Sequence, residues 1–322
     1  MIGNKGSESR RASPYVSVII TCYNQDRWLG SALESVLTQN HPNLEILVVD
    51  DASTDNTQHV VAGFPQVKYI RHSQSNGGPA AARNTGLENS NGGLVAFLDG
   101  DDLWLAGKLH AQVKYLEANP EISLVYTPVL VLDKSQNITT WPRMFSGRLT
   151  FGRLLISNPI VPSSVMVRRS CFEKVGLFDT NLKGTDDWEM WLRITSLFRV
   201  ARLKKPLAIF RDHGAGLHTD YDSHFKYQVE AINKVREFTE KHALGIPSRI
   251  FDQAVAVRYI QMGLNWLETG NVPRFESLFP EGMKRAHGVP VRIWLRILAL
   301  SLRHSRLGAT AARAIWHQVT EW

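Results

Sequence analysis

The feature that most constrains the fold is a series of short apolar segments that alternate with helical patterns in the first half of the chain. Residues 16–21 (VSVIIT), 44–49 (LEILVV) and 94–98 (LVAFL) are apolar runs, typical of strands buried on both faces of a sheet. Between the first two runs, apolar residues recur at helical spacing over 28–37, which predicts an amphipathic helix. Strands separated by helices predict an α/β fold, with a mostly parallel sheet and helices on both of its faces.

Shorter patterns extend this prediction along the rest of the chain. Gly77, Gly78 and Pro79 are expected to open a helix, and Asp55 is expected to cap another. From about residue 222 the periodicity is helical, with breaks at 245–247, 270–273 and 288–290, so we expect a helical C-terminal region. Further strands are expected at 67–70, 124–126, 163–167 and 207–210, a loop at 141–150, and further helices at 108–118, at 170–175 and after Thr185.

The composition is that of an ordinary globular protein. Of 322 residues, 43% are hydrophobic and 21% charged, which is too apolar for a disordered chain and too charged for a membrane bundle. No run approaches the ~20 apolar residues of a spanning helix, and residues 1–14 are expected to form a flexible tail rather than a secretory signal. Two cysteines support neither a disulfide framework nor a zinc site, so the expected location is the reducing cytoplasm.

The positive charge is concentrated at the C-terminal end. Residues 284–322 hold seven Lys or Arg and one acid, which accounts for +6 of the formal net charge of +7. A nucleic-acid partner is therefore not expected, because that function needs a basic face on the folded domain. Arg292, Arg296, Arg303 and Arg306 fall close to one helical face. They suggest peripheral binding to an anionic membrane surface, on the inner face of the membrane, with a helix packed on the catalytic domain as the alternative.

Polar side chains follow each of the three central strands. In parallel sheets, ligands bind beyond the carboxyl ends of the strands. The three strand ends are 21–24 (TCYN), 50–51 (DD) and 99–102 (DGDD). Three carboxylates within four residues repel one another, and a divalent cation would relieve that repulsion. Oxygen ligands favour Mg²⁺ or Mn²⁺, and a solvated acidic turn is the alternative.

The same strand ends could hold a nucleotide. Asp51 could accept a base N–H, although Asp is also common after a strand, and Tyr23 could offer a flat surface to a base or simply pack. Gly78 would expose backbone N–H groups at a helix start, where a phosphate fits, and Arg83 could add a bidentate hydrogen bond. Other nucleotide and hydrolase signatures are absent: the sequence has no GxGxxG after its first strand, no GxxxxGK[ST], no HExxH and no GxSxG.

Five blocks of this sequence resemble the family-2 glycosyltransferases of GT-A fold. They are VSVIITCYNQDRWLGSALESVLTQ, LEILVVDDASTDNT, NGGPAAARNTGL, LVAFLDGDDLW, and SSVMVRRSCFEKVGLFD followed by TDDWEMWLR. Their order and spacing match, and the resemblance covers residues 15–213. It implies an inverting, metal-dependent transfer of a sugar from a nucleotide-sugar donor to a saccharide or lipid-linked saccharide acceptor, as in cell-surface polysaccharide assembly.

The resemblance also implies roles for individual residues. Asp99 is expected toward the ribose, Asp101 as the direct metal ligand, and His213 near the metal or the diphosphate. Asp187 matches the catalytic base, with Asp186 before it as the second candidate, and Trp188 could stack on an acceptor sugar. The nucleotide-binding set is Thr21, Tyr23, Asn24, Asp51, Gly78, Arg83 and Asp99.

The sequence predicts a tail over 1–14, a GT-A domain over 15–215 and a helical region over 216–322. Two other functions stay open. One is nucleotidyl transfer onto a sugar phosphate, which would call for a glycine-rich, basic segment after the first strand. The other is a nucleotide-sugar-binding protein without catalysis, which the presence of Asp187 disfavours.

Overall fold

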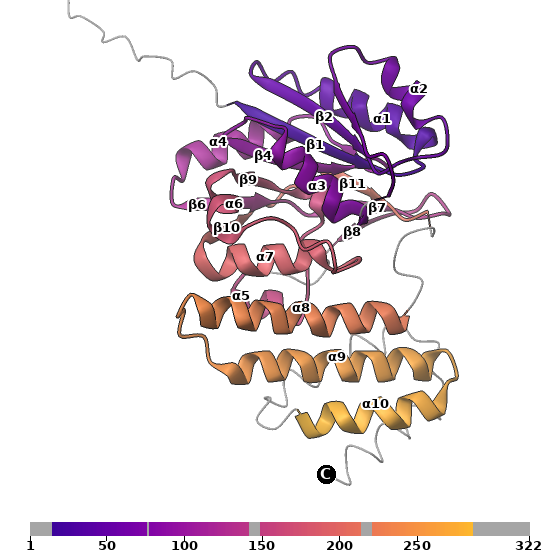
Figure 1. The fold of residues 1–322 in the computed structure, drawn as a ribbon, viewed down its shortest axis with the longest axis vertical. Helices are drawn as coiled ribbons and strands as arrows, with labels where there is room; N and C mark the ends of the chain where they lie inside the picture. The colour runs from indigo at the N-terminus through magenta and orange to yellow at the C-terminus, as the bar shows by residue number, and fades with distance from the viewer. Residues whose placement is uncertain (1–14, 76, 142–148, 214–220, 286–322) are drawn as a thin grey trace, which may run out of the picture. The chain divides into compact units, whose positions relative to one another are not determined.

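The structure is a computed structural model that describes residues 15–75, 77–141, 149–213 and 221–285 (Figure 1). The chain forms two compact units, each built from three separate stretches. Unit 1 comprises Met1–Arg143, Ile160–Leu177 and Arg199–Arg211, and unit 2 comprises Met144–Pro159, Phe178–Phe198 and Asp212–Trp322. The three-part division expected from the sequence stays a prediction.

Unit 1 contains a seven-stranded sheet in the order β10-β6-β9-β4-β1-β2-β3. The β1–β2, β1–β4, β2–β3 and β6–β10 pairs are parallel, and β9 runs antiparallel to both β4 and β6. The predicted mostly parallel sheet is therefore confirmed. The strands are β1 (Val16–Cys22), β2 (Leu44–Asp50), β3 (Lys68–Arg71), β4 (Leu94–Asp99), β6 (Ile122–Tyr126), β9 (Met166–Arg168) and β10 (Arg199–Arg202).

Helices cover both faces of this sheet because its central strands are apolar on both sides. Every residue of β1 is buried. Val16, Val18 and Ile20 pack in one core with residues of α1 (Asp26–Leu37), α2 (Thr57–Ala62) and α4 (Lys108–Ala118). Ile19 points to the other face, toward α3 (Gly78–Glu88), where a Cβ on Gly86 would lie 2.3 Å from its side chain. On this second face α3 is joined by α6 (Ser170–Val175), whose Phe172 ring makes an edge-to-face contact with Phe97 of β4.

A second sheet of unit 1 was not predicted from the sequence. Its order is β5-β11-β7-β8, with β5 (Leu103–Trp104), β7 (Val129–Leu132), β8 (Ile138–Trp141) and β11 (Ala208–Arg211). The β7–β11 pair is parallel and the other two pairs are antiparallel. The strand expected at 207–210 is β11, displaced by one residue. The other three strands have two to four residues and several half-buried positions, so their periodicity is too short to recognise.

Two local predictions are wrong in detail. The strand expected at 163–167 is a 3-10 turn, η1 (Pro162–Ser164), followed by β9, because Pro162 fixes the first position of the turn. In the helix expected after Asp55, the N-cap position is Asn56, which makes no side-chain capping bond, while Asp55 Oδ1 accepts a hydrogen bond from the backbone N–H of Thr57 at 3.0 Å. The loop expected at 141–150 falls mainly on 142–148, outside the described residues.

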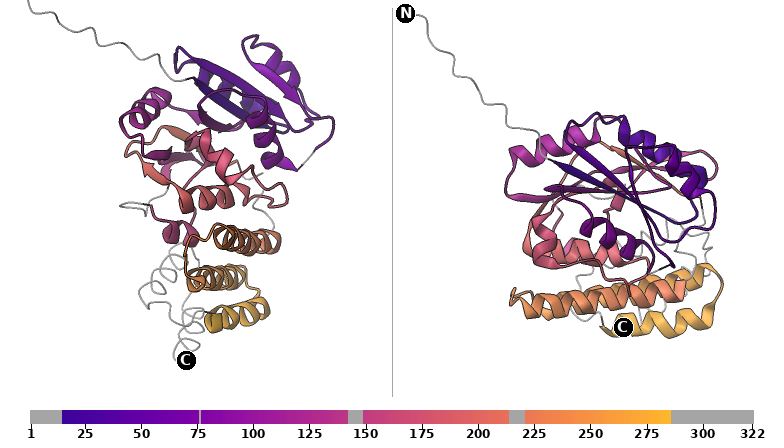
Figure 2. Two further views of the ribbon diagram at one scale, coloured as in Figure 1. Left: turned by 60° about the vertical axis from the view of Figure 1, so that its left-hand side comes forward. Right: turned by 45° about the horizontal axis from the view of Figure 1, so that its top comes forward.

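Unit 2 is helical in its described part. It contains α5 (Phe151–Ile156), α7 (Asp186–Leu197), α8 (Tyr221–Lys241), α9 (Ser248–Glu268) and α10 (Val272–Arg285). The last three helices lie side by side (Figures 1 and 2). Gly282 lets α10 approach α9 closely, since a Cβ there would lie 2.6 Å from the Ile260 side chain. The break expected at 245–247 lies at 242–247 and the break expected at 270–273 lies at 269–271, so both are confirmed within three residues.

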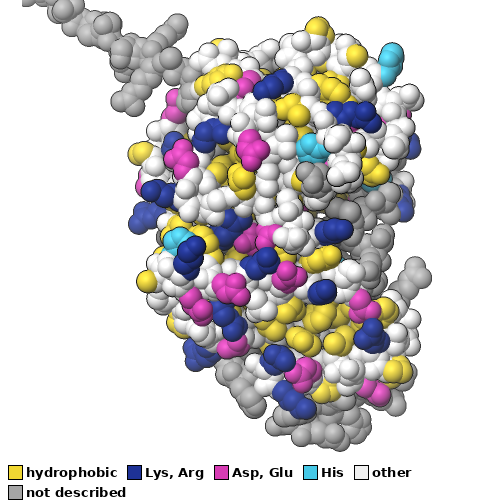
Figure 3. Space-filling model, viewed as in Figure 1, with side chains coloured by type: hydrophobic (Ala, Val, Ile, Leu, Met, Phe, Trp, Pro, Cys, Tyr) yellow, Lys and Arg dark blue, Asp and Glu magenta, His cyan; other side chains and the backbone are white. Residues whose placement is uncertain are grey.

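The third expected break, at 288–290, and the basic segment 286–322 lie outside the described residues. Within the described ranges, no helix has both the length and the hydropathy needed to cross a membrane. On the face drawn in Figure 3, Lys and Arg side chains are interspersed with Asp and Glu. That face therefore has no broad surface of a single charge.

Candidate active site

The ends of β1 and β4 join three of the predicted nucleotide-binding residues. Thr21 and Asp99 are register partners in the parallel β1–β4 pair, and the Thr21 hydroxyl donates to Asp99 Oδ1 at 3.1 Å. The Arg83 guanidinium, from the first turns of α3, donates to the same oxygen at 2.9 Å. Thr21 and Arg83 are almost fully buried, whereas the Asp99 side chain is 26% exposed. The Asp99 carboxylate is therefore held in one direction beside the Arg83 guanidinium, at the carboxyl ends of the central strands.

Asp51 lies at the neighbouring strand end and is held from two sides. Its Oδ1 contacts His72 Nδ1 at 2.8 Å, and its Oδ2 accepts a hydrogen bond from the Ser75 hydroxyl at 2.8 Å. The other ring nitrogen of His72 contacts the Thr85 hydroxyl of α3 at 2.9 Å. The imidazole thus bridges the end of β2 to α3 and fixes the direction of the Asp51 carboxylate.

The loop after β1 places Tyr23 and Asn24 differently. Tyr23 is 52% exposed, so a base can reach its side chain. Asn24 has a left-handed backbone (φ 51°), and its side-chain oxygen accepts a hydrogen bond from the backbone N–H of Thr54 at 2.8 Å. Its own N–H donates to the Ser53 hydroxyl at 2.9 Å. In this structure, Asn24 holds two loops together rather than reaching outward.

The start of α3 has the geometry expected of a phosphate-facing helix end. Gly77 (φ 104°) and Gly78 (φ 68°) both adopt the left-handed region, which favours glycine. No side chain caps the helix, and a Cβ on Gly78 would meet nothing within 4 Å. The first turn of α3 is therefore not capped by a side chain, and the helix dipole favours an anion at this end.

The acidic turn after β4 is fixed from behind by two residues that sequence reasoning did not select. Asp102 is fully buried, and it accepts hydrogen bonds from the Ser163 hydroxyl at 2.5 Å and from the Arg211 N–H at 3.0 Å. The Ser163 hydroxyl also accepts a hydrogen bond from the backbone N–H of Asp99 at 3.1 Å. The Arg211 guanidinium donates to the carbonyl of Asp101 at 3.0 Å. The turn is thus braced at three of its four residues.

The buried position of Asp102 separates its role from that of its neighbours. Burial raises the pKa of its carboxyl well above the usual value, and the charges of Asp101 and Asp99 raise it further, against the hydrogen bonds from Ser163 and Arg211. Asp102 therefore braces the turn. Asp101 and Asp99, which are half-buried, are the two carboxylates that a ligand can reach.

These two carboxylates fit a divalent cation that also takes oxygens from a substrate. Among the residues that the structure describes, no three His, Cys, Asp or Glu side chains form a group that could hold a metal ion. Mg²⁺ is commonly bound by one or two carboxylates together with substrate phosphates, and oxygen donors suit Mn²⁺ as well. Asp99 Oδ1 already accepts two hydrogen bonds, which leaves Asp101 as the more suitable ligand. His213 is assigned to unit 2, whereas Asp99 and Asp101 are in unit 1.

The candidate base is in unit 2, at the start of α7. Asp187 is half-buried; its Oδ1 accepts a hydrogen bond from the Trp188 N–H at 2.7 Å, and its Oδ2 accepts one from the Asn158 amide at 3.2 Å. Asp186 is 3% exposed. The left-handed Gly184 (φ 73°) makes the sharp turn into the helix. Of the two acids, Asp187 is the one that the surface leaves accessible, and Asn158 orients it.

Trp188 does not offer an open face to a sugar. Its ring is 4% exposed, its indole N–H donates to the Leu154 carbonyl at 2.7 Å, and the Arg258 guanidinium lies 5.2 Å from its ring centroid. The stacking role expected for it is therefore wrong for this structure, because the ring is fully used in packing α7 against α5 and α9.

Residues missed by the sequence analysis share one property. Each of these side chains has its partner far along the chain; the residues are His72, Ser75, Asn158, Ser163 and Arg211. A sequence signal existed for Ser163, which begins the strand expected at 163–167, and for Arg211, which directly follows the strand expected at 207–210.

Solved structures confirm the class of fold. The crystal structure of S. aureus TarS 1–349 in complex with UDP-GlcNAc is similar, with a TM-score of 0.60 and 16% identity over 84% of this chain and 92% of that chain. The mannosyltransferase PcManGT from Pyrobaculum calidifontis, in complex with GDP-Man and Mn²⁺, has a TM-score of 0.58 and 23% identity over 94% and 88%. At these identities the likeness shows the fold alone, and that fold is the predicted GT-A type.

Sequence comparisons then define the family. The family described as Glycosyl transferase family 2 matches residues 17–176. An uncharacterized glycosyltransferase of Rickettsia felis is 36% identical over 68% of this chain, which covers 36% of that relative. The UDP-Glc:alpha-D-GlcNAc-diphosphoundecaprenol beta-1,3-glucosyltransferase WfgD of Escherichia coli is 31% identical over 56% of this chain and 69% of its own length. The chain belongs to glycosyl transferase family 2.

Proposed function

We propose that the chain is an inverting glycosyltransferase that moves a sugar from a nucleoside diphosphate donor to a saccharide or lipid-linked saccharide acceptor. The observation that carries this proposal is the group at the ends of β1 and β4, where Thr21 and Arg83 hold Asp99 beside the acidic turn. Membership in family 2 supports it. The Escherichia coli relative, a glucosyltransferase that acts on a diphosphoundecaprenol-linked sugar, supports the lipid-linked acceptor, and we propose a role in cell-surface polysaccharide assembly on that basis.

On the donor side, the chain supplies a base site, a ribose site and a phosphate site. We assign the base to Tyr23 and Asp51, because the ring is exposed and the carboxylate is held in one direction by His72 and Ser75. Asp99 accepts from the ribose hydroxyls, and the open first turn at Gly78 faces the diphosphate. Thr21 and Arg83 act by fixing Asp99, and Asn24 acts by fixing the loop.

Asp101 would hold the divalent cation, Mn²⁺ or Mg²⁺, with Asp99 and His213 as further candidates. When bound, such a cation stabilises the charge that develops on a leaving diphosphate. The chain's part is to keep Asp101 reachable, and the brace formed by Asp102, Ser163 and Arg211 does this by fixing the backbone on both sides of it.

On the acceptor side, Asp187 takes the proton from the attacking hydroxyl. The hydroxyl oxygen forms a bond to the anomeric carbon while the bond from that carbon to the diphosphate breaks, so a single displacement inverts the configuration. The hydrogen bond from Asn158 fixes the direction of the half-buried Asp187 carboxylate, whereas Asp186 is buried.

The test is release of nucleoside diphosphate from a panel of nucleotide-sugars, with saccharide and lipid-linked acceptors present, in Mn²⁺ and in EDTA. Acceptor-dependent release supports glycosyl transfer. Release of inorganic diphosphate from a sugar phosphate and a nucleoside triphosphate would indicate nucleotidyl transfer instead, and binding without turnover would indicate a sensor.

Three variants and one control test the assigned acids. Asp187→Asn should lower turnover about 10²–10⁴-fold with nearly unchanged donor affinity, and Asp186→Asn should lower it less. A larger loss for Asp186→Asn would reverse the assignment. Asp101→Asn should abolish metal-dependent nucleotide binding, whereas Glu121→Gln, an exposed acid of unit 1, should leave it unchanged. Tight, metal-independent binding by the unaltered protein would refute the metal site.

We further propose that the protein works in the cytoplasm, at the inner face of a membrane, through its basic C-terminal segment. The support is the charge of that segment, since four Arg near an anionic surface contribute at most about 4 kcal/mol. Sedimentation with anionic liposomes tests this: deletion after Gly288 should remove binding, and unchanged binding would refute it.

A further inference from the structure

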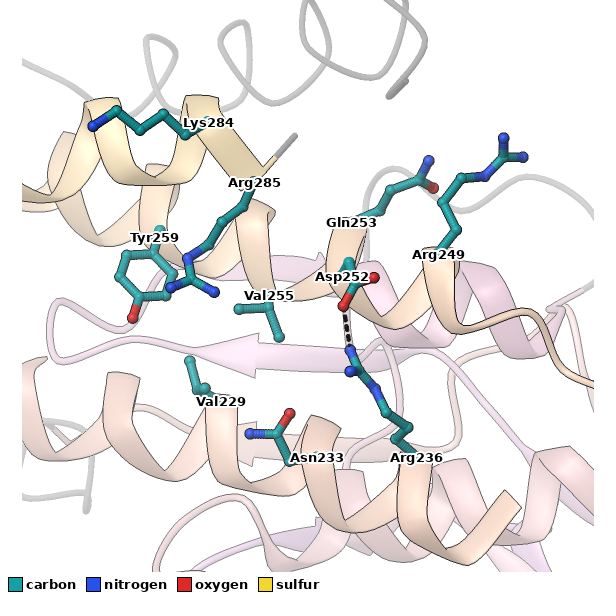
Figure 4. A pocket seen from close by; sticks show the side chains of 10 residues that line it. All are labelled: Val229, Asn233, Arg236, Arg249, Asp252, Gln253, Val255, Tyr259, Lys284 and Arg285. Carbon is teal, nitrogen blue, oxygen red and sulfur yellow. Dashed lines mark hydrogen bonds and ion pairs between the residues drawn. The ribbon is translucent and has the colours of Figure 1, made fainter. Parts of the chain in front are cut away.

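A pocket of about 430 Å³ lies within unit 2, among α8, α9 and α10 (Figure 4). Its volume is in the range of small-molecule sites, roughly 300–1,000 Å³. None of its lining residues belongs to the proposed donor site or to the candidate base. Its walls come from three helices and combine four cationic side chains with one carboxylate: Arg236, Arg249, Lys284 and Arg285, with Asp252.

The pocket carries a formal charge of +3, and part of that charge has no protein partner. Arg236 donates to Asp252 at 2.6 Å, which satisfies the single carboxylate of the lining. Among the described residues, no carboxylate pairs with Arg249 or Lys284. Arg285 pairs with Glu281 on its own helix at 2.9 Å, but both side chains are well exposed, and such pairs are worth only about 0.2–0.5 kcal/mol. An anionic ligand can therefore recruit Arg285 at small cost.

Two guanidinium groups are already aimed at the same space. In Figure 4, Arg236 and Arg285 reach from α8 and α10 toward the region beside Asn233, while the side chains of Arg249 and Lys284 extend away from it. The Tyr259 ring supports Arg285, whose guanidinium carbon lies 5.0 Å from the ring centroid. The Nε–H of Arg236 is buried and has no hydrogen-bond partner. A buried donor without a partner costs about 1–3 kcal/mol, so an acceptor oxygen placed there would be stabilised.

The start of α9 adds to this field. The helix has 21 residues, begins at Ser248 beside Arg249, and has no side-chain cap at Pro247. The positive end of its dipole is therefore at the rim of the pocket, which favours negative charge. The apolar Val229 and Val255 complete the wall and lower the access of water to the guanidinium groups.

We propose that this pocket binds a phosphate-bearing anion, at a site separate from the donor site. A phosphoryl group carries up to two negative charges and three acceptor oxygens, so it can accept from guanidinium groups on different helices at once. A carboxylate has fewer oxygens and matches a site of charge +3 less well. The phosphate can belong to a soluble molecule or to the headgroup of a lipid, and both present the same chemistry to Arg236 and Arg285.

The test titrates the full chain with inorganic diphosphate in EDTA by calorimetry, so that metal-dependent binding at the donor site does not contribute. The pocket variant combines Arg249→Gln with Arg285→Gln, both at exposed positions. The control combines Lys226→Gln with Lys241→Gln, which removes the same charge from exposed positions outside the pocket. We expect the unaltered protein and the control to bind equally, and the pocket variant to bind at least tenfold more weakly.

A second arm separates the two sources of phosphate. Vesicles of phosphatidylcholine with phosphatidic acid are compared with pure phosphatidylcholine vesicles by sedimentation. Weaker binding of the pocket variant than of the control to the acidic vesicles, without any binding of soluble diphosphate, assigns the site to a lipid headgroup. Equal behaviour of the pocket variant and the control in both arms, or binding to neither ligand by the unaltered protein, overturns the proposal.

Discussion

Removing the hydroxyl oxygen of Ser163 tests whether its hydrogen bonds hold the acidic turn, 99–102, in place. This hydroxyl is fully buried, donates to Asp102 at 2.5 Å and accepts from the Asp99 N–H at 3.1 Å. Ser163→Ala removes both hydrogen bonds, and it leaves a buried carboxyl group and a backbone N–H with one partner fewer each. The adjacent Ser164 is an ideal control, because it is equally buried and its hydroxyl donates only to the local Val161 carbonyl at 2.7 Å.

The expected magnitudes follow from these contacts. Loss of one ordinary hydrogen bond costs about 0.5–1.5 kcal/mol, whereas a buried polar group left without its partner costs about 1–3 kcal/mol, and more when it is charged. Ser163→Ala should therefore lower the free energy of unfolding about 2 kcal/mol more than Ser164→Ala does. Because the turn also carries Asp101, Ser163→Ala should weaken Mn²⁺-dependent binding of a nucleoside diphosphate about ten- to a hundredfold, as is typical when a partner of a metal ligand is removed.

Urea unfolding of the two variants measures the first effect, and calorimetric titration with UDP and GDP in Mn²⁺ and in EDTA measures the second. Binding is compared at a temperature where both variants are folded by circular dichroism. If the two variants lose the same stability, the brace does not work as described. If Ser163→Ala loses stability but keeps its nucleotide affinity, the brace supports the fold without positioning Asp101.

Three further outcomes are expected. A Cβ on Gly92 would lie 2.5 Å from the backbone of β1, so Gly92→Ala should destabilise by about 1–3 kcal/mol in thermal unfolding, whereas Gly93→Ala, with nothing within 4 Å, should stay within about 0.5 kcal/mol; equal effects would contradict the packing. Burial raises the pKa of Asp179, but hydrogen bonds, of which the one from Lys234 is the strongest, lower it below its usual value. The ion pair between Asp179 and Lys234 therefore stabilises the protein above about pH 4, and this stabilisation is lost as the pH falls. Urea unfolding should therefore show Asp179→Asn to cost about 1 kcal/mol at pH 7 and less at pH 3, and a constant difference would refute this. Burial raises the pKa of the Cys171 thiol to about 11, so at pH 8 it should react with a disulfide reagent only after unfolding, and fast labelling of the native protein would argue against its burial.

The central sheet could be predicted because its physical cause is local in the sequence. Strands buried on both faces must be apolar at consecutive positions, and residues 16–21 and 44–49 show this directly. The strand ends could be predicted for the same reason, since the sheet brings Thr21 and Asp99 into register. The strands of the second sheet are too short to show a period, so β5 and β8 gave no comparable signal.

What could not be predicted is mostly the polar interior. Lys108 would be placed in solvent by any hydrophobicity pattern, yet it is fully buried, donates to Gln112 at 2.8 Å and lies 4.0 Å from the centroid of the Trp104 ring. Burial lowers the pKa of its ammonium group well below the usual value. The contact of Asp51 with His72 has the same character, because it depends on the spatial order of strands and not on any spacing along the chain.

The acidic turn is synthesised before the residue that completes its brace. Residues 94–102 leave the ribosome more than a hundred residues before Arg211, whose N–H and guanidinium complete the contacts to the turn. Until β11 is synthesised and pairs with β7, the nascent domain carries the turn without its last support. The same fact limits how far the gene can be shortened: a fragment that ends at residue 176, where the family match ends, would lack β10 and β11 and therefore half of the brace.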